Sequence, residues 1–523
     1  MSARKAPGEP LIAGSDWTFP RLEQIDLAVR ETACNRFGLD VYPNQIEVIA
    51  SEQMLDAYAS LGLPIHYPHW SFGKAFIRHE QAYKRGHAGL AYEIVINSNP
   101  CISYLMEENT LAMQALVIAH AAYGHNSFFK GNYLFRQWTQ ADAIIDYMVF
   151  ARRYVLECED RHGPQAVEAI LDAAHALMHH GVDRYHHPRP LSAEAEAQRL
   201  AERAQHDWKN FDDIWRTLPA RRQREVPERA RRGRRVPEEP QENLLYFIEK
   251  HAPALEPWQR ELIRIVRKLA QYFYPQGQTK VMNEGWASFW HYTLLNALYD
   301  EGQVADGCLM EILASHTNVV FQPGFDHPGY SGINPYALGF GMFRELRRIC
   351  EEPTREDRHF FPDIAGGDWQ RVLDFAMRQF KDESFIAQFL SPRLIRELHL
   401  FAVADHSDDP EFVSIDAIHN EEGYRRLRTL LARQYARESM VPDIQVTDFD
   451  LRGDRSLTLT HYQRRGRPLS QEVNAVLDHL QSLWSYPVHL ETRDESGALV
   501  RAAAEGEAEA DEEDEGGGLI IRP

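Results

Sequence analysis

Apolar residues recur at helical spacing through most of the first 400 residues of the chain. This period predicts helices over 17–59, 102–130, 143–158 and 164–179. It continues in Glu242–Tyr274, Glu284–Asp300, Leu309–Thr317, Leu338–Cys350, Trp369–Phe380 and Pro392–Phe401. One segment, Ala91–Asn97, is instead short, rich in β-branched residues and closed by Ser98-Asn99-Pro100, so we expect a strand there.

The pattern changes in the last hundred residues before the C-terminal tail. Alternating or β-branched segments predict four strands, and two helical segments lie between them. The strands are Phe412–Ile418, Asp443–Phe449, Leu457–Tyr462 and Val488–Glu491, and the helices are Glu421–Tyr435 and Gln471–Trp484. This βαββαβ order is that of a ferredoxin-like unit.

We therefore predict an α+β protein, with a large, predominantly α-helical N-terminal domain that carries a short strand element. A small ferredoxin-like βαββαβ C-terminal domain follows it. The expected divisions are a flexible N-terminus at 1–16, the helical domain at 17–404, the C-terminal domain at 405–500 and an acidic disordered tail at 501–523. Within the helical domain, residues 217–241 are rich in Arg and Pro, which is typical of a flexible insertion.

Composition excludes several classes of protein. The 523 residues are 44% hydrophobic and 26% charged, as in globular rather than disordered chains. The net charge of −20 disfavours nucleic acid as a partner, because nucleic-acid binders carry a basic footprint. Eight of the acidic residues fall in 505–515, and such a run repels itself in water.

Further features predict a cytoplasmic protein without membrane insertion. The five cysteines form no CxxC pair, which fits a reducing compartment. The first ten residues hold no apolar core of the kind that secretory signals need. The longest apolar stretch, 111–124, is too short to span a bilayer.

His120 and His125 form the first cluster with metal-ligand chemistry. Zinc enzymes often place two histidines at i and i+4 of one helix, whereas the i, i+5 spacing found here would separate the side chains by about 140° on a regular helix. A π-bulge would bring the two rings together, and Gly124 makes such an irregularity easier. The alternative is one histidine in the core and the other at a helix end.

Glu284 and His291 form the second cluster, in a helix rich in aromatic residues. Seven residues apart, they differ by only about 20° around a helix and share one face. Either or both would complete a His/His/Glu metal set with His120 and His125. The alternative is a pair of buried hydrogen bonds that hold helices together. A later Gly- and Pro-rich stretch suggests a cleft-forming loop, with candidate lining residues His316, Asn318, Asn334 and Tyr336.

Several of these segments closely resemble the stage V sporulation protein R (SpoVR) family. The resemblance rests on Tyr92–Asn97, Ala119-His120, Gly124–Asn126, Asn283–Ala287, Ser315–Val320, Asn334–Gly339 and Gly453–Leu457. It implies a role in spore cortex formation or in stationary-phase stress. It also implies association with a PrkA-like serine kinase and a von Willebrand-type companion protein.

The strand, the paired histidines and the later Glu-Gly-Trp-Ala are also similar to zinc metallopeptidases of the gluzincin kind. In those enzymes a general-base glutamate follows the first histidine, and here Ala121 stands in its place. The likeness suggests one divalent ion, zinc first, held by His120, His125, Glu284 and His291. Glu284 or Glu93 would then be the catalytic carboxylate.

Two hypotheses about function follow. The first is a metal-dependent, hydrolase-like site that acts on a peptide or cell-wall-related substrate. The second is a non-catalytic stress regulator or scaffold, in which the histidines and Glu284 serve core packing. If the side chains of His120, His125 and Glu284 meet within a few ångström of one point, the metal-site hypothesis is favoured. If each of these side chains is hydrogen-bonded separately, the scaffold hypothesis is favoured.

Overall fold

A computed structural model of the chain divides into two compact units. The first contains residues 1–172, 268–441 and 509–523, and the second contains 173–267 and 442–508. The structure describes residues 9–59, 67, 69–70, 74, 77, 93–184, 237, 239–324, 327, 330, 332–405, 413–415, 420–436, 441–450, 453–464, 468–470, 472–503 and 520–522. Most of the Arg-rich insertion and most of the acidic tail lie outside these residues.

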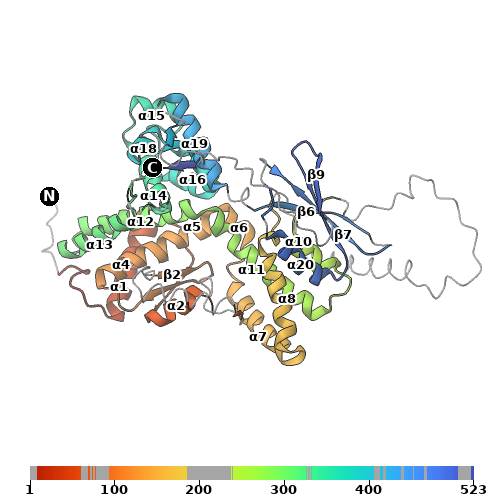
Figure 1. Ribbon diagram of the computed structural model, residues 1–523. Helices are drawn as coiled ribbons and strands as arrows, with labels where there is room; N and C mark the ends of the chain where they lie inside the picture. The colour runs from red at the N-terminus through yellow and green to blue at the C-terminus, as the bar shows by residue number, and fades with distance from the viewer. Residues whose placement is uncertain are drawn as a thin grey trace, which may run out of the picture. The chain divides into compact units, whose positions relative to one another are not determined.

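The first unit is mostly helical (Figure 1). Its helices are α1 (Phe19–Arg30), η1 (Glu31–Arg36), α2 (Ser51–Ala59), α4 (Leu111–Val117), η2 (Ile118–His125), α5 (Asn126–Gly131), α6 (Tyr133–Trp138), α7 (Ile144–His162), α12 (Lys280–Asp300), α13 (Asp306–Val319), α14 (Pro335–Glu351), α15 (Arg355–Phe360), α16 (Trp369–Gln379), α17 (Asp382–Phe389), α18 (Pro392–Glu397) and α19 (Glu421–Tyr435). The helices α8 (Pro164–Ala176) and α11 (Pro257–Gln278) contribute residues to both units.

A three-stranded sheet of order β1-β3-β2 lies in the first unit. The expected strand is confirmed as β2 (Glu93–Ile96), which pairs antiparallel with β3 (Cys101–Met106). Two helix predictions were wrong: β1 (Asn44–Ile49) interrupts 17–59, and β3 occupies the start of 102–130. Over segments this short, the period alone does not separate helix from strand, and pairing with neighbouring strands decides the outcome.

Helix α12 lies at the centre of this unit, packed between η2 and α14 (Figure 1). Most of its side chains are buried, as expected for a core helix that is apolar on all sides. Small residues allow the close packing. A Cβ atom on Gly124 would lie 2.6 Å from Ala287 Cα, and one on Gly339 would lie 2.8 Å from Gly285 Cα. The backbones of three helices therefore meet at these four positions.

The first turn of α12 is capped by a residue about a hundred positions later. The Asp382 carboxylate accepts hydrogen bonds from the backbone N–H groups of Val281 and Met282, both at 2.9 Å. Thr279, at the usual capping position, instead donates its hydroxyl to the Pro275 carbonyl. Asp382 is 2% exposed, so a buried anion neutralises the positive end of the helix.

The α+β class is confirmed, but the ferredoxin-like arrangement is not. The four-stranded sheet of the second unit has the order β6-β7-β8-β9. Its strands are β6 (Asp443–Phe449), β7 (Leu457–Tyr462), β8 (Val488–Arg493) and β9 (Leu499–Ala503), and η3 (Met178–His180), α10 (Leu244–His251) and α20 (Val473–Trp484) belong to the same unit. Trp484 of α20 packs against Phe247 and Phe449.

The first strand of the expected βαββαβ order pairs elsewhere. Strand β5 (Val413–Ile415) pairs with β4 (Phe401–Asp405), which also pairs with β10 (Ile520–Arg522). With α19, these strands belong to the first unit. Strand β10 lies in the segment that we expected to be a disordered tail. Its short apolar run, Ile520-Ile521, can pair through its backbone with β4.

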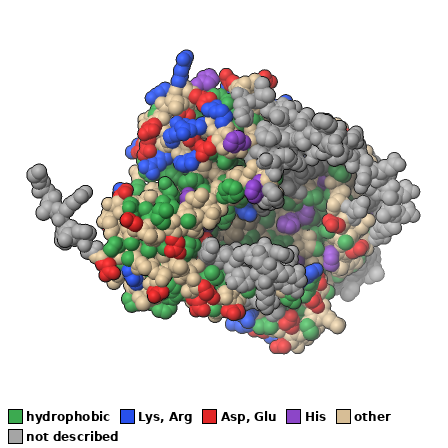
Figure 2. Space-filling view, turned by 60° about the vertical axis from the view of Figure 1, so that its left-hand side comes forward, with side chains coloured by type: hydrophobic (Ala, Val, Ile, Leu, Met, Phe, Trp, Pro, Cys, Tyr) green, Lys and Arg blue, Asp and Glu red, His purple; other side chains and the backbone are tan. Residues whose placement is uncertain are grey.

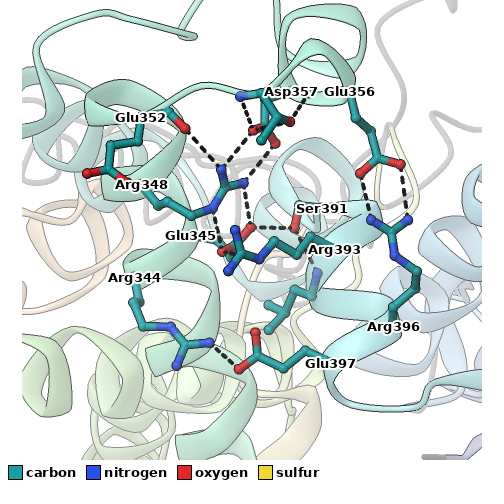
Figure 3. A network of polar contacts seen from close by, with 12 residues as sticks. Arg344, Glu345, Arg348, Glu352, Glu356, Asp357, Ser391, Arg393, Arg396 and Glu397 are labelled. Carbon is teal, nitrogen blue, oxygen red and sulfur yellow. Dashed lines mark hydrogen bonds and ion pairs between the residues drawn. The ribbon is translucent and has the colours of Figure 1, made fainter.

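An ion-pair network joins α14, α15 and α18 (Figure 3). Arg348 donates to both carboxylate oxygens of Glu345 and to both of Asp357, at 2.8–2.9 Å. Ser391 donates to Glu345, and Arg396 pairs with Glu356. On the face of the molecule that Figure 2 shows, Lys and Arg side chains also lie among Asp and Glu side chains.

The described helices include none that is long and apolar enough to cross a membrane.

We predict that Gly285→Ala destabilises the protein. Replacing a helical glycine by alanine normally stabilises by about 1 kcal/mol, but here the new methyl group meets the Gly339 backbone, which cannot move aside cheaply. Overpacking of this kind costs about 1–3 kcal/mol. Gly307→Ala in α13 is the control, because a Cβ there has no neighbour within 4 Å. In urea unfolding, the free energy of unfolding should fall for Gly285→Ala and rise for Gly307→Ala. Equal changes in the two variants would contradict the packing argument.

The Asp357 carboxylate should make stability depend on pH. Burial alone would raise its pKa, but hydrogen bonds from Arg348 and Thr354 hold the pKa at about 2. A folded-state pKa below the unfolded value of about 3.9 stabilises the fold above that value, and the contribution disappears as pH falls towards 2.

Asp357→Asn should therefore lower the free energy of unfolding by about 2 kcal/mol at pH 7, and by less as pH falls from 4 to 3. Urea titrations across this range measure the difference from wild type. Asp363→Asn, at an exposed position, should leave stability unchanged. A constant penalty for Asp357→Asn from pH 7 to pH 3 would contradict the assignment.

Candidate metal centre

A π-helix brings His120 and His125 together. Both lie in η2, whose wider turn replaces the α-helical one between Ile118 and His125. The centroids of the two rings are 4.6 Å apart and their planes are perpendicular. The sequence spacing thus has the structural explanation that it suggested. Gly124 also allows a close helix contact, because the absence of a side chain lets Ala287 of α12 approach the backbone of η2.

Strand β2 adds a carboxylate to the two histidines. Glu93 Oε1 lies 3.7 Å from His120 Nε2. One donor atom from each of Glu93, His120 and His125 lies within 4.8 Å of the other two. Within the described part of the chain, this is the one such group of three or more His, Cys, Asp or Glu residues. The donors come from a strand and a helix that pack directly together.

Glu284 approaches the same group from α12, the helix that packs against η2. Its Oε2 atom lies 3.5 Å from His125 Nε2. This oxygen is buried and has no hydrogen-bond partner among the described residues. Because buried carboxylate oxygens are normally satisfied, Glu284 is a candidate for contact with a bound group.

Asn283 orients His125. The amide oxygen of Asn283 lies 2.9 Å from His125 Nδ1, and an amide oxygen only accepts. Nδ1 therefore carries the proton, and the lone pair of Nε2 faces the Glu284 carboxylate. Metal-binding histidines commonly have this arrangement, in which the distant nitrogen donates to an oxygen.

His291 and His316 lie behind His120 in a row of imidazoles. His120 Nδ1 is 2.9 Å from His291 Nδ1, and His291 Nε2 is 2.8 Å from His316 Nδ1. If His120 donates from Nδ1, each following ring accepts at Nδ1 and donates from Nε2. That assignment leaves the lone pair of His120 Nε2 directed towards Glu93. The structure therefore places His291 beside a candidate ligand, outside the triad.

Burial favours the uncharged form of His120, His291 and His316. It lowers the pKa of His120 and of His291 well below the ordinary value, and neighbouring histidines add to the effect. For His316, burial and the charge of Arg344 lower the pKa to about 4. In contrast, burial and then the Glu284 charge raise the pKa of Glu93 to about 8. The site thus contains uncharged imidazoles next to Glu93, whose carboxyl group holds its proton more readily than usual.

The other predicted lining residues lie on α13, α14 and the loop between them. Asn318 is exposed. Asn334 caps α14 through the Tyr336 N–H, and its amide donates to the carbonyls of Val319 and Phe321. The hydrogen bonds of Asn334 therefore join the end of α13 to the start of α14, and His316 is joined to the histidine row.

The donor set suits a divalent cation of the zinc type. Imidazole nitrogens and a carboxylate oxygen are zinc ligands, and three protein ligands leave a position for water or substrate. Sequence reasoning missed Asn283 as the partner of His125, although it directly precedes Glu284. It also missed Ser288, a buried hydroxyl on the same helix with no hydrogen-bond partner among the described residues.

Comparison with known proteins gives a consistent result. A family model described as "SpoVR like protein" matches residues 16–440, and one described as "SpoVR-like C-terminal domain" matches residues 442–495. The chain is 58% identical over 486 residues to "Uncharacterized protein YcgB" of Escherichia coli (strain K12), which covers 93% of this chain and 94% of that protein. No solved structure matches it. The chain belongs to the SpoVR family.

Proposed function

We propose that the protein binds one divalent metal ion, with zinc as the first candidate. It would use this ion in a hydrolase-like reaction on a peptide or cell-wall-related substrate. The proposal rests on one observation: donor atoms of Glu93, His120 and His125 lie within 4.8 Å of one another. In such a site a zinc ion would polarise a carbonyl group and make water more acidic.

We assign the base to Glu284. A hydrolytic site needs an acceptor for the proton of the attacking water. Ala121 stands where gluzincin-like peptidases carry that glutamate, so the acceptor has to come from another element. Glu284 has a buried oxygen without a hydrogen bond and lies next to His125, whereas Glu93 belongs to the ligand group.

The Glu284 oxygen without a hydrogen bond among the described residues also favours this proposal over a purely structural one. In a scaffold without a ligand, each buried polar atom would be expected to find a partner in the core. His291 and His316 meet that expectation, and Glu284 does not. Association with a PrkA-like kinase and a von Willebrand-type protein, and a cytoplasmic role in stress or sporulation, stay predictions from family resemblance.

Metal analysis tests the site. We expect about one zinc per chain in wild-type protein after reconstitution, measured by mass spectrometry of the metal. His120→Ala and His125→Ala should abolish stoichiometric binding. Asn283→Ala should weaken zinc binding about 10- to 100-fold, because it removes only the group that orients His125. Glu284→Gln should keep the metal, since a base is not a ligand.

His359→Ala is the matched control, because this histidine is 60% exposed and distant in sequence from both clusters. It should bind zinc like wild type. Reconstituted wild-type protein without zinc, manganese or iron would overturn the proposal. Equal zinc content in wild type and His125→Ala would show that the metal lies elsewhere.

A further inference from the structure

Ser288 is a buried polar residue in the middle of α12. Its side chain is 0% exposed, and its hydroxyl has no hydrogen bond within the described part of the structure. Serines in helices commonly bond the carbonyl four residues earlier, as the hydroxyl of nearby Thr293 does with Phe289. An unsatisfied buried hydroxyl costs free energy, so its presence calls for an explanation.

The position of Ser288 links it to the candidate metal centre. It follows Glu284 by four residues and precedes His291 by three, and residues at these spacings are neighbours on one side of a helix. Two buried oxygen atoms without hydrogen bonds, Glu284 Oε2 and Ser288 Oγ, therefore occupy adjacent turns of α12. Two such atoms on one helix face are available to a common occupant, whereas Trp290 Nε1, the other such atom of α12, lies on a different face.

We propose that Ser288 is a substrate-binding residue, whose hydroxyl donates a hydrogen bond to the carbonyl oxygen of an amide. This inference rests on the proposed function, and it names the chemical class of the substrate. Glu284 can only accept a hydrogen bond when ionised, whereas Ser288 can donate one. The pair therefore suits a group that presents a carbonyl oxygen to Ser288 and leaves Glu284 to the attacking water.

Charge favours an uncharged amide over a phosphate ester. The ion pairs that Glu93 and Glu284 make among the described residues are with histidines, and no Lys or Arg pairs with either carboxylate. Phosphate sites usually provide Arg, Lys or several backbone N–H groups for the anion. An ionised Glu284, which the role of base requires, would repel a phosphoryl group, while a neutral amide experiences no such repulsion.

Removal of the hydroxyl tests the inference, with Ser127→Ala as the matched control. Ser127 is also buried, but it is fully bonded: it accepts from Trp286 Nε1 and donates to the Gly124 carbonyl. Ser127→Ala should therefore lower the Tm. Ser288→Ala should leave the Tm unchanged or raise it, because it removes an unsatisfied group.

Ligand binding is measured by NMR titration of the full chain with acetyl-alanyl-alaninamide, and separately with inorganic phosphate. The amide should bind wild-type protein, and Ser288→Ala should weaken it roughly three- to tenfold, as expected for one neutral hydrogen bond. Ser288→Thr, which keeps a hydroxyl, should retain most of the binding. Ser127→Ala should bind the amide like wild type.

Three results would overturn the inference. One is a Tm loss in Ser288→Ala equal to that of Ser127→Ala, which would indicate a structural hydrogen bond or a buried water. The others are amide binding that is absent or insensitive to Ser288, and Ser288-dependent binding of phosphate in place of the amide. Each titration is run on metal-free and zinc-treated protein, with zinc content measured in parallel. Failure of zinc binding therefore refutes the proposed function independently of the amide result.

Discussion

The candidate site depends on how closely three helices approach one another. Helix α12 lies between η2 and α14, and at both contacts the backbones meet without intervening side chains. Gly124 faces Ala287 on one side, and Gly285 faces Gly339 on the other. This packing places Glu284 next to His125 and His291 next to His120. Interiors packed to this density do not adjust to added volume, so small residues at these positions determine where the polar groups lie.

The buried polar groups around Arg348 and those around His125 differ in how completely their atoms are hydrogen-bonded. Around Arg348, every carboxylate oxygen of Glu345 and Asp357 accepts a hydrogen bond from the guanidinium, which is the arrangement expected of a structural network. Next to His125, by contrast, an oxygen of Glu284 has no hydrogen bond among the described residues. The first arrangement satisfies its polar atoms within the fold, and the second leaves hydrogen-bonding capacity unused among the described residues.

The sequence allowed the main parts of the site to be predicted, because they are encoded locally. The i, i+5 spacing with Gly124 indicated a π-bulge, and the family-specific segment around Glu284 indicated the second helix. Other features depend on tertiary contacts that no local pattern encodes. Strand β3 resembles a helix until β1 and β2 pair with it, and β5 leaves the expected βαββαβ order by pairing with β4. Ser288 looks like an ordinary small helical residue until its missing partner is seen.

The capping of α12 by Asp382 has a consequence for synthesis of the protein on the ribosome. The histidines and Glu284 emerge well before Asp382, yet the first amides of α12 have their acceptor only after that residue leaves the exit tunnel. Until then these N–H groups must be hydrated, and the helix that carries Glu284 cannot be buried in its final position without cost. Burial of this end of α12, which carries Glu284, is therefore completed only after Asp382 has been synthesised.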